Sequence, residues 1–83
     1  MSIEKHDLLK EFPDHHHTIR HLKMHDQHFI RVLGNYDAIT DEIYRMEIGV
    51  ETPSDEVLDA KKMQRVHLKD ELYSMIVETE DAA

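Results

Sequence analysis

Imidazole side chains are the groups of this chain best suited to chemistry, and six of its eight histidines lie in one stretch, DHHHTIRHLKMHDQH, residues 14–28. Four of them, His17, His21, His25 and His28, are spaced four, four and three residues apart. On an α-helix, residues at these spacings share one face, and two imidazoles one turn apart can bind a zinc, nickel or copper ion together. Histidine also titrates near neutral pH. The stretch therefore raises two hypotheses, a metal site and a pH response whose sign the sequence leaves open.

A specific metal site requires a third protein ligand, together with acceptors for the free ring nitrogens. Antiparallel pairing with a second helix would bring Glu78 and Glu80 opposite residues 21–25. The alternative is that the histidines form a solvent-exposed side face, which holds no cofactor and binds zinc or nickel only adventitiously. We favour this alternative, because on a helical wheel the histidine face lies roughly 100° from the apolar direction of the same segment.

Enzymatic chemistry has little support in the sequence. The chain has no cysteine, which excludes disulfides, thiolate metal sites and cysteine nucleophiles, and favours a reducing compartment. Its hydroxyl nucleophiles Ser2, Ser54 and Ser74 have no recognisable base and acid at useful spacing. We therefore expect a protein that is not an enzyme.

Nucleic-acid binding is opposed by the net charge of −8. The one basic stripe that could support a role as a nucleic-acid accessory protein consists of Lys61, Lys62 and Arg65. We expect these three side chains to pair with acidic residues of the neighbouring helix instead, namely Asp37, Asp41 and Glu42. Such pairs help to fix the register of two helices, although each exposed pair adds only about 0 to 1 kcal/mol.

The apolar spacing predicts which elements position these groups. Apolar residues recur at intervals of three and four between FPDH at 12–15 and GVETPSDE at 49–56, which is a heptad pattern. This pattern predicts one long helix over residues 14–48, with Asp14 as its N-cap. Asp26 and Thr40 are polar residues on the same seam. We expect them to set the register of packing rather than to act as ligands.

The remainder of the chain completes a single domain over residues 1–83. Gly49 opens a turn over 49–52, and a second helix is predicted over 53–78, with Thr52 as its cap and Pro53 at its first position. An acidic tail follows at 79–83. The segment 2–12 could add a short N-terminal helix through its apolar residues Ile3, Leu8, Leu9 and Phe12.

Two long helices joined by a short turn predict an all-α fold, a long antiparallel helical hairpin that resembles a coiled coil. Facing residue numbers should then add up to about 101, which pairs Ile43 with Leu58 and Phe29 with Leu72. Because one seam buries little apolar surface, we expect the hairpin to dimerise into a four-helix bundle or to dock on an unidentified protein partner. The predicted interaction seam comprises Ile19, Leu22, Phe29, Leu33, Tyr36, Ile43, Leu58, Leu68, Leu72 and Met75.

No stretch of the chain predicts contact with a membrane. No apolar run approaches the roughly 18 residues that a spanning helix needs, and MSIEKHDLLKEF at the N-terminus lacks a basic region followed by an apolar run. We therefore expect a cytoplasmic protein.

Three segments resemble a known family. FPDHHHTIRHLKMHDQHF, YDAITDEIYRME with the following GVETPSD, and above all HLKDELY at 67–73 are similar to the YdcH-like family, small bacterial proteins of unknown function. The resemblance runs from about His6 to Ile76. It implies a helical hairpin or coiled coil and implies no activity. The chain departs from the family pattern in DAKKMQRV, where relatives usually carry an apolar residue at the position of Lys61 and a basic one at that of Met63.

These observations favour a non-enzymatic protein–protein interaction or scaffolding module. The first alternative is a small metal-binding protein that uses the histidine face. The second and weaker alternative is a nucleic-acid accessory protein.

Overall fold

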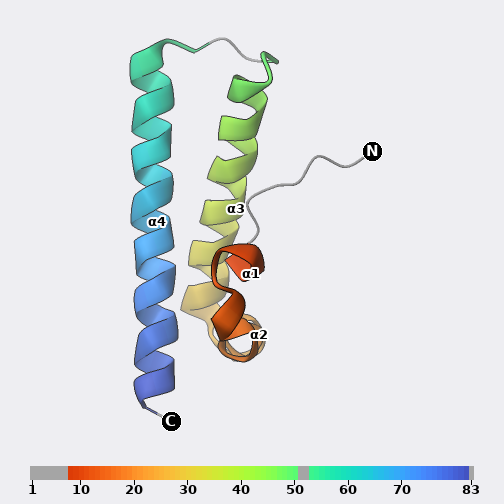
Figure 1. The fold of residues 1–83 in the computed structure, drawn as a ribbon, viewed down its shortest axis with the longest axis vertical. Helices are drawn as coiled ribbons and strands as arrows, with labels where there is room; N and C mark the ends of the chain where they lie inside the picture. Colours follow the sequence, from red (N-terminus) through yellow and green to blue (C-terminus); the bar gives the residue numbers. More distant parts are fainter. Residues whose placement is uncertain (1–7, 51–52, 83) are drawn as a thin grey trace.

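The computed structural model describes residues 8–50 and 53–82, and within these ranges it contains helices and turns but no strand. The elements are α1 Leu8–Glu11, a 3-10 turn η1 Pro13–His15, α2 His16–His25, α3 Gln27–Glu47 and α4 Asp55–Asp81. In Figure 1, α3 and α4 lie side by side and run in opposite directions, while α2 lies across their lower end. The predicted all-α class is confirmed. Most of the segment 2–12 and the predicted Thr52 cap lie outside the described residues.

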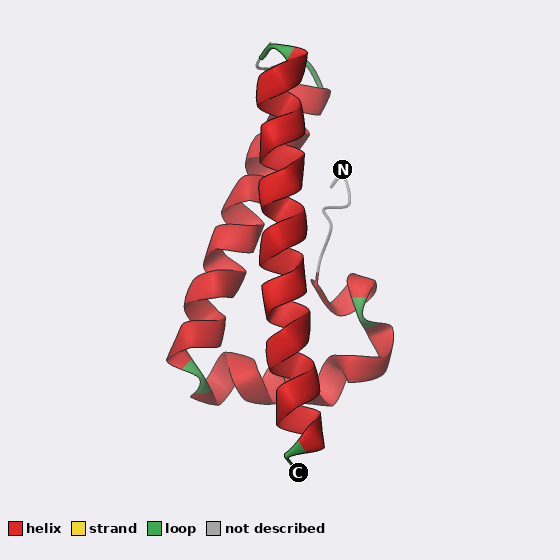
Figure 2. Ribbon diagram, turned by 90° about the vertical axis from the view of Figure 1, so that its left-hand side faces the viewer, coloured by secondary structure: helices red, strands yellow, loops and turns green. Residues whose placement is uncertain are grey.

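The prediction of one helix over 14–48 is wrong, because Asp26 divides the segment into α2 and α3. Its backbone is extended, with φ −115° and ψ 107°, and its side chain accepts a hydrogen bond of 3.0 Å from the Phe29 N–H. A carboxylate that satisfies a free amide in the first turn favours a new helix start. Figure 2 shows the resulting sharp corner between α2 and α3. Asp26 is therefore a helix cap and not a register residue on a continuous seam.

The other helix ends also differ from the predicted ones. Asp14 lies within η1, and α2 begins at His16 without a side-chain cap. Ser54 caps α4, because its hydroxyl accepts a hydrogen bond of 3.3 Å from the Val57 N–H. Helix α4 extends to Asp81, so most of the predicted acidic tail is helical. Gly49 has a φ of 86°, a left-handed conformation that glycine adopts readily, and it follows the end of α3 as predicted.

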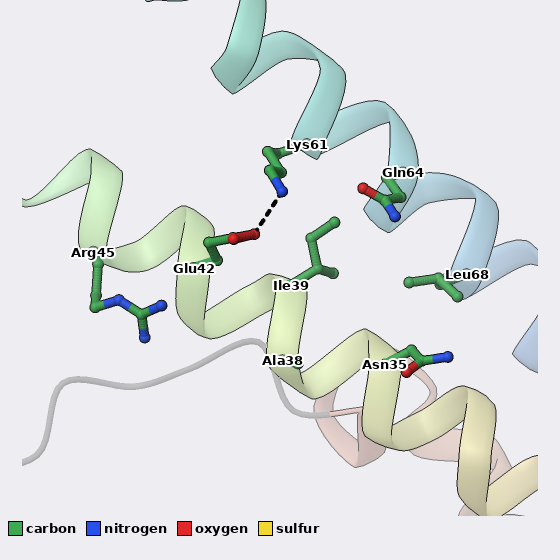
Figure 3. A pocket seen from close by; sticks show the side chains of 8 residues that line it. All are labelled: Asn35, Ala38, Ile39, Glu42, Arg45, Lys61, Gln64 and Leu68. Carbon is green, nitrogen blue, oxygen red and sulfur yellow. Dashed lines mark ion pairs between the residues drawn. The ribbon is translucent and has the colours of Figure 1, made fainter. Parts of the chain in front are cut away.

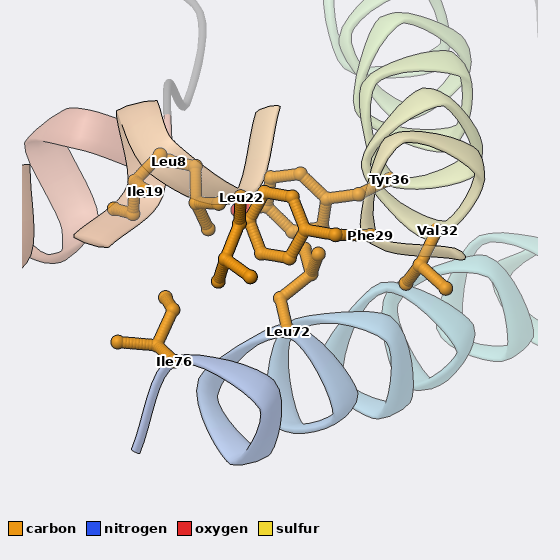
Figure 4. Packing of buried hydrophobic residues seen from close by; sticks show 8 residues of the cluster. All are labelled: Leu8, Ile19, Leu22, Phe29, Val32, Tyr36, Leu72 and Ile76. Atoms are coloured by element: carbon orange, nitrogen blue, oxygen red, sulfur yellow. The ribbon is translucent and has the colours of Figure 1, made fainter. Parts of the chain in front are cut away.

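The main core lies where α2 crosses the α3–α4 pair. Residues from all four helices meet there, as Figure 4 shows, and each is at most 5% exposed: Leu8, Ile19, Leu22, Phe29, Val32, Tyr36, Leu72 and Ile76. The corner at Asp26 makes this possible, because it turns the apolar side of α2 across the end of the pair. Four further side chains pack against the cluster while partly exposed: Phe12, Leu33, Leu68 and Met75.

A second group of buried residues lies further along α3, at Ile39, Thr40 and Ile43. Thr40 is 4% exposed, and its hydroxyl oxygen has no hydrogen-bond partner among the residues that the structure describes. A buried hydroxyl without a partner destabilises a fold by about 1 to 3 kcal/mol. This polar seam residue therefore weakens the packing between α3 and α4.

The shape of the molecule is elongated, with principal extents of 45 × 29 × 20 Å. Across the described residues, no helix combines the length and the apolar character that a membrane span requires.

Candidate functional site

The predicted interaction seam lies largely inside the chain. Six of its residues are no more than 4% exposed, namely Ile19, Leu22, Phe29, Tyr36, Ile43 and Leu72. The other four are half-buried, namely Leu33, Leu58, Leu68 and Met75. The six buried side chains therefore stabilise the fold of the single chain, and only the four half-buried ones keep surface exposed to solvent.

The predicted histidine face is divided by the corner at Asp26. His17, His21 and His25 lie on α2, whereas His28 lies on α3. The rings of His21 and His25 lie 4.8 Å apart between centroids, and both side chains are exposed. Within the described part of the chain, no group of three or more histidine and acidic side chains is placed to hold a metal ion. The structure therefore brings together one pair of the four proposed ligands.

The carboxylates at the end of α4 reach α2, but Glu80 contacts a histidine outside the predicted set. His15 Nδ1 lies 2.7 Å from Glu80 Oε2, and the Thr18 hydroxyl donates to the same oxygen over 2.7 Å. The hydrogen bond from His15, followed by that from Thr18, holds the pKa of Glu80 below its usual value. Glu78 borders a hollow together with His21 without bonding to it. His28 Nε2 lies 3.1 Å from Glu71 Oε2.

Aromatic and charged contacts hold the segment that comprises α1 and η1 against α4. The Phe12 ring stacks on that of Tyr73, with 5.2 Å between centroids, and the His15 ring meets both at their edges. Lys69 Nζ donates to Glu11 Oε2 over 2.9 Å and lies 5.6 Å from the Phe12 centroid. Sequence reasoning missed this cluster, because its members come from segments that share no periodic pattern.

A groove of about 510 Å³ runs between α3 and α4, and Figure 3 shows the residues that line it. Lys61 reaches across it to Glu42, with 2.9 Å between Nζ and Oε1, which confirms this cross-helix pair. Lys62 reaches Glu47 over 3.3 Å. Two of the three residues of the basic stripe therefore pair with α3, whereas Arg65 forms no ion pair with another residue that the structure describes.

The outer face of α4 has a different character, and the sequence did not single it out. Met63, Val66 and Tyr73 are 59%, 50% and 44% exposed, and Val77 is half-buried. These four residues, here called the outer stripe, are spaced three, seven and four residues apart, so they follow one side of the helix. In Figure 2, α4 lies in front of the other helices along its length, and none of them covers the side toward the viewer.

Two packed long helices with a crossing third helix define the chain as a small all-helical protein. The chain belongs to a protein family of unknown function (DUF465), whose family model matches residues 29–76. The resemblance to the YdcH-like family agrees with this membership. The match covers most of α3 and most of α4, and it begins after the histidine-rich stretch. No curated protein and no solved structure matches the chain.

Proposed function

We propose that the protein is a non-enzymatic interaction or scaffolding module whose docking surface is the outer stripe of α4. The observation that carries this proposal is the exposure of Met63, Val66 and Tyr73 on one side of a helix. Neighbouring exposed apolar side chains of this kind are typical of surfaces that bind another protein. The α3–α4 pair acts as a coiled-coil-like hairpin that holds α4 in place along its length. The absence of cysteine supports a cytoplasmic location.

Burial of the predicted seam within the chain supports the outer stripe as the docking surface. Leu72 and Ile76 are fully buried against α2 and α3, so they stabilise the fold and are not available to a partner. Met63 and Val66 lie on the same helix and take no part in that core cluster, whereas Tyr73 stacks on Phe12, which packs against the cluster. A substitution at Met63 or Val66 should therefore affect binding while the fold persists. The homodimer expected from the sequence would use the seam, six residues of which already pack inside one chain.

Affinity capture with matched baits tests the proposal. The wild-type chain, a Met63→Gln, Val66→Gln variant and an Ile30→Gln control are each immobilised and exposed to lysate of the native cell. Ile30 is 44% exposed but lies on α3, away from the stripe. We expect a protein that the wild type and the control retain and the stripe variant loses. The same set of retained proteins on all three baits would refute the proposal.

A further inference from the structure

The charges of α4 are separated by side. Apart from His67, every exposed charged residue of this helix is acidic: Asp55, Glu56, Asp59, Asp70, Glu71, Glu78, Glu80 and Asp81. Its four basic residues are all half-buried: Lys61, Lys62, Arg65 and Lys69. The helix therefore presents a negative surface to solvent, although its sequence contains both signs of charge.

Ion pairs within the chain hold three of these bases toward other elements. Lys61 pairs with Glu42 and Lys62 with Glu47, both on α3, at 2.9 and 3.3 Å. Lys69 pairs with Glu11 of α1 at 2.9 Å. Because these lysines already have acidic partners, they do little to neutralise the acidic residues on the outward side of α4.

Two of those acidic residues continue the outer stripe. Asp59, Met63, Val66, Asp70, Tyr73 and Val77 follow one another at spacings of four and three. Asp59 and Asp70 are exposed, and the side chain of neither forms a hydrogen bond or ion pair with any residue that the structure describes. Along one side of α4, each of these two unpaired carboxylates is therefore followed by two apolar residues.

We propose that the outer stripe binds a cationic amphipathic helix of a partner protein. Its apolar side packs on Met63, Val66 and Tyr73, and its Lys or Arg side chains pair with Asp59 and Asp70. Alternating apolar and charged positions of this kind determine both the register and the choice of partner in paired helices. This inference rests on the proposed function and specifies the chemistry of the partner.

A second copy of the chain is less suited to the stripe. If two α4 helices paired in parallel, Asp59 and Asp70 would each face the same residue of the other chain, and like charges repel. If they paired antiparallel about the middle of the segment 59–77, Asp70 would face Val66, and its carboxylate would be desolvated without a partner. A basic helix avoids both arrangements.

Fluorescence anisotropy with a synthetic peptide tests the inference. The probe is a labelled helix-forming peptide with Leu at the packing positions and Lys at the flanking ones, and its control replaces every Lys with Glu. We expect the full chain to bind the cationic peptide at least about ten-fold more tightly than the acidic one. Added salt should weaken this binding, because salt screens exposed charges.

Matched variants show whether the peptide binds at the stripe. The Met63→Gln, Val66→Gln variant should weaken binding by about ten-fold, and Asp59→Asn with Asp70→Asn should weaken it several-fold and reduce its salt dependence. Ile30→Gln and Asp14→Asn, which change exposed residues elsewhere, should leave it unchanged. Circular dichroism confirms that each variant is folded. All the changed α4 residues are exposed, so we expect both stripe variants to keep the fold.

The outcomes separate this inference from the proposed function. Equal binding to all variants would show general charge attraction and would overturn the inference. A dimer in sedimentation equilibrium that the stripe variant abolishes, without peptide binding, would identify a second copy as the occupant and would also overturn it. If the capture experiment finds a stripe-dependent partner but the peptide does not bind, the inference fails and the proposed function stands.

Discussion

Replacing Asp26 with Ala should destabilise the protein measurably, because this side chain starts α3 at the corner on which the core depends. The carboxylate is half-buried and accepts the Phe29 N–H over 3.0 Å. Loss of an N-cap of this kind costs about 0.5 to 2 kcal/mol. In a domain of this size, 1 kcal/mol corresponds to a fall in Tm of about 4 to 8 °C.

Thermal unfolding followed by far-ultraviolet circular dichroism measures the effect. Asp26→Asn retains an acceptor oxygen, so we expect it to remain within about 0.5 kcal/mol of the wild type. Ser54→Ala removes the equivalent cap of α4, where the bond is longer at 3.3 Å and exposed, so it should cost less than Asp26→Ala. If Asp26→Ala matches the wild type, or if Asp26→Asn is as unstable as Asp26→Ala, the side chain does not stabilise the corner by capping.

Three further predictions concern single groups. The hydrogen bonds of His15 and Thr18 lower the pKa of Glu80 from its ordinary value of 4.5. These bonds should therefore stabilise the folded protein fully at pH values above 4.5, and this stabilisation should be lost as the pH falls through the lowered pKa. As the pH falls from about 6 to about 3, the Tm of Glu80→Gln should therefore decrease less than that of the wild type or of Glu78→Gln. Equal decreases in Tm would show that Glu80 does not stabilise the fold through these hydrogen bonds. Thr40→Val removes a buried hydroxyl that has no partner among the described residues, so it should raise the free energy of unfolding in urea by about 1 kcal/mol. Thr40→Ser keeps the hydroxyl and should not raise it. If Thr40→Val is less stable than the wild type, the hydroxyl is hydrogen-bonded. Calorimetric titration with nickel should detect only weak binding, and the double variant His21→Ala, His25→Ala should lose it, because no third ligand for this exposed pair lies among the described residues. Tight binding accompanied by a higher Tm would restore the metal hypothesis.

The helices were predictable from the sequence, but the corner between α2 and α3 was not. Leu22 and Phe29 are seven residues apart, a spacing that fits one uninterrupted helix, and neither Gly nor Pro lies between them. Asp26 is therefore the only residue between them that indicates a break, and an aspartate is also common on the surface of an uninterrupted helix. Pairing between α3 and α4 was easier to predict, since the position of the turn alone places Lys61 near Glu42.

The histidine face shows a different limit of prediction. The spacing of His17, His21 and His25 correctly indicates one side of α2, but it does not reveal how α2 is oriented toward α4. That orientation depends on the corner at Asp26, and it brings Glu80 to His15 instead. The outer stripe was missed for a related reason, because Val66 and Tyr73 also fit the edge of a core until the buried side of α4 is known.

The main core joins residues that are far apart along the chain, since Leu8 and Ile76 belong to one cluster. Bringing them together closes a loop of most of the sequence, and the entropy lost on closure increases with loop length. Pairing of α3 with α4 across their short connection closes a much smaller loop and can form sooner. We therefore expect α1 and α2 to dock late in folding, against Leu72 and Ile76 of an α4 that is already paired with α3.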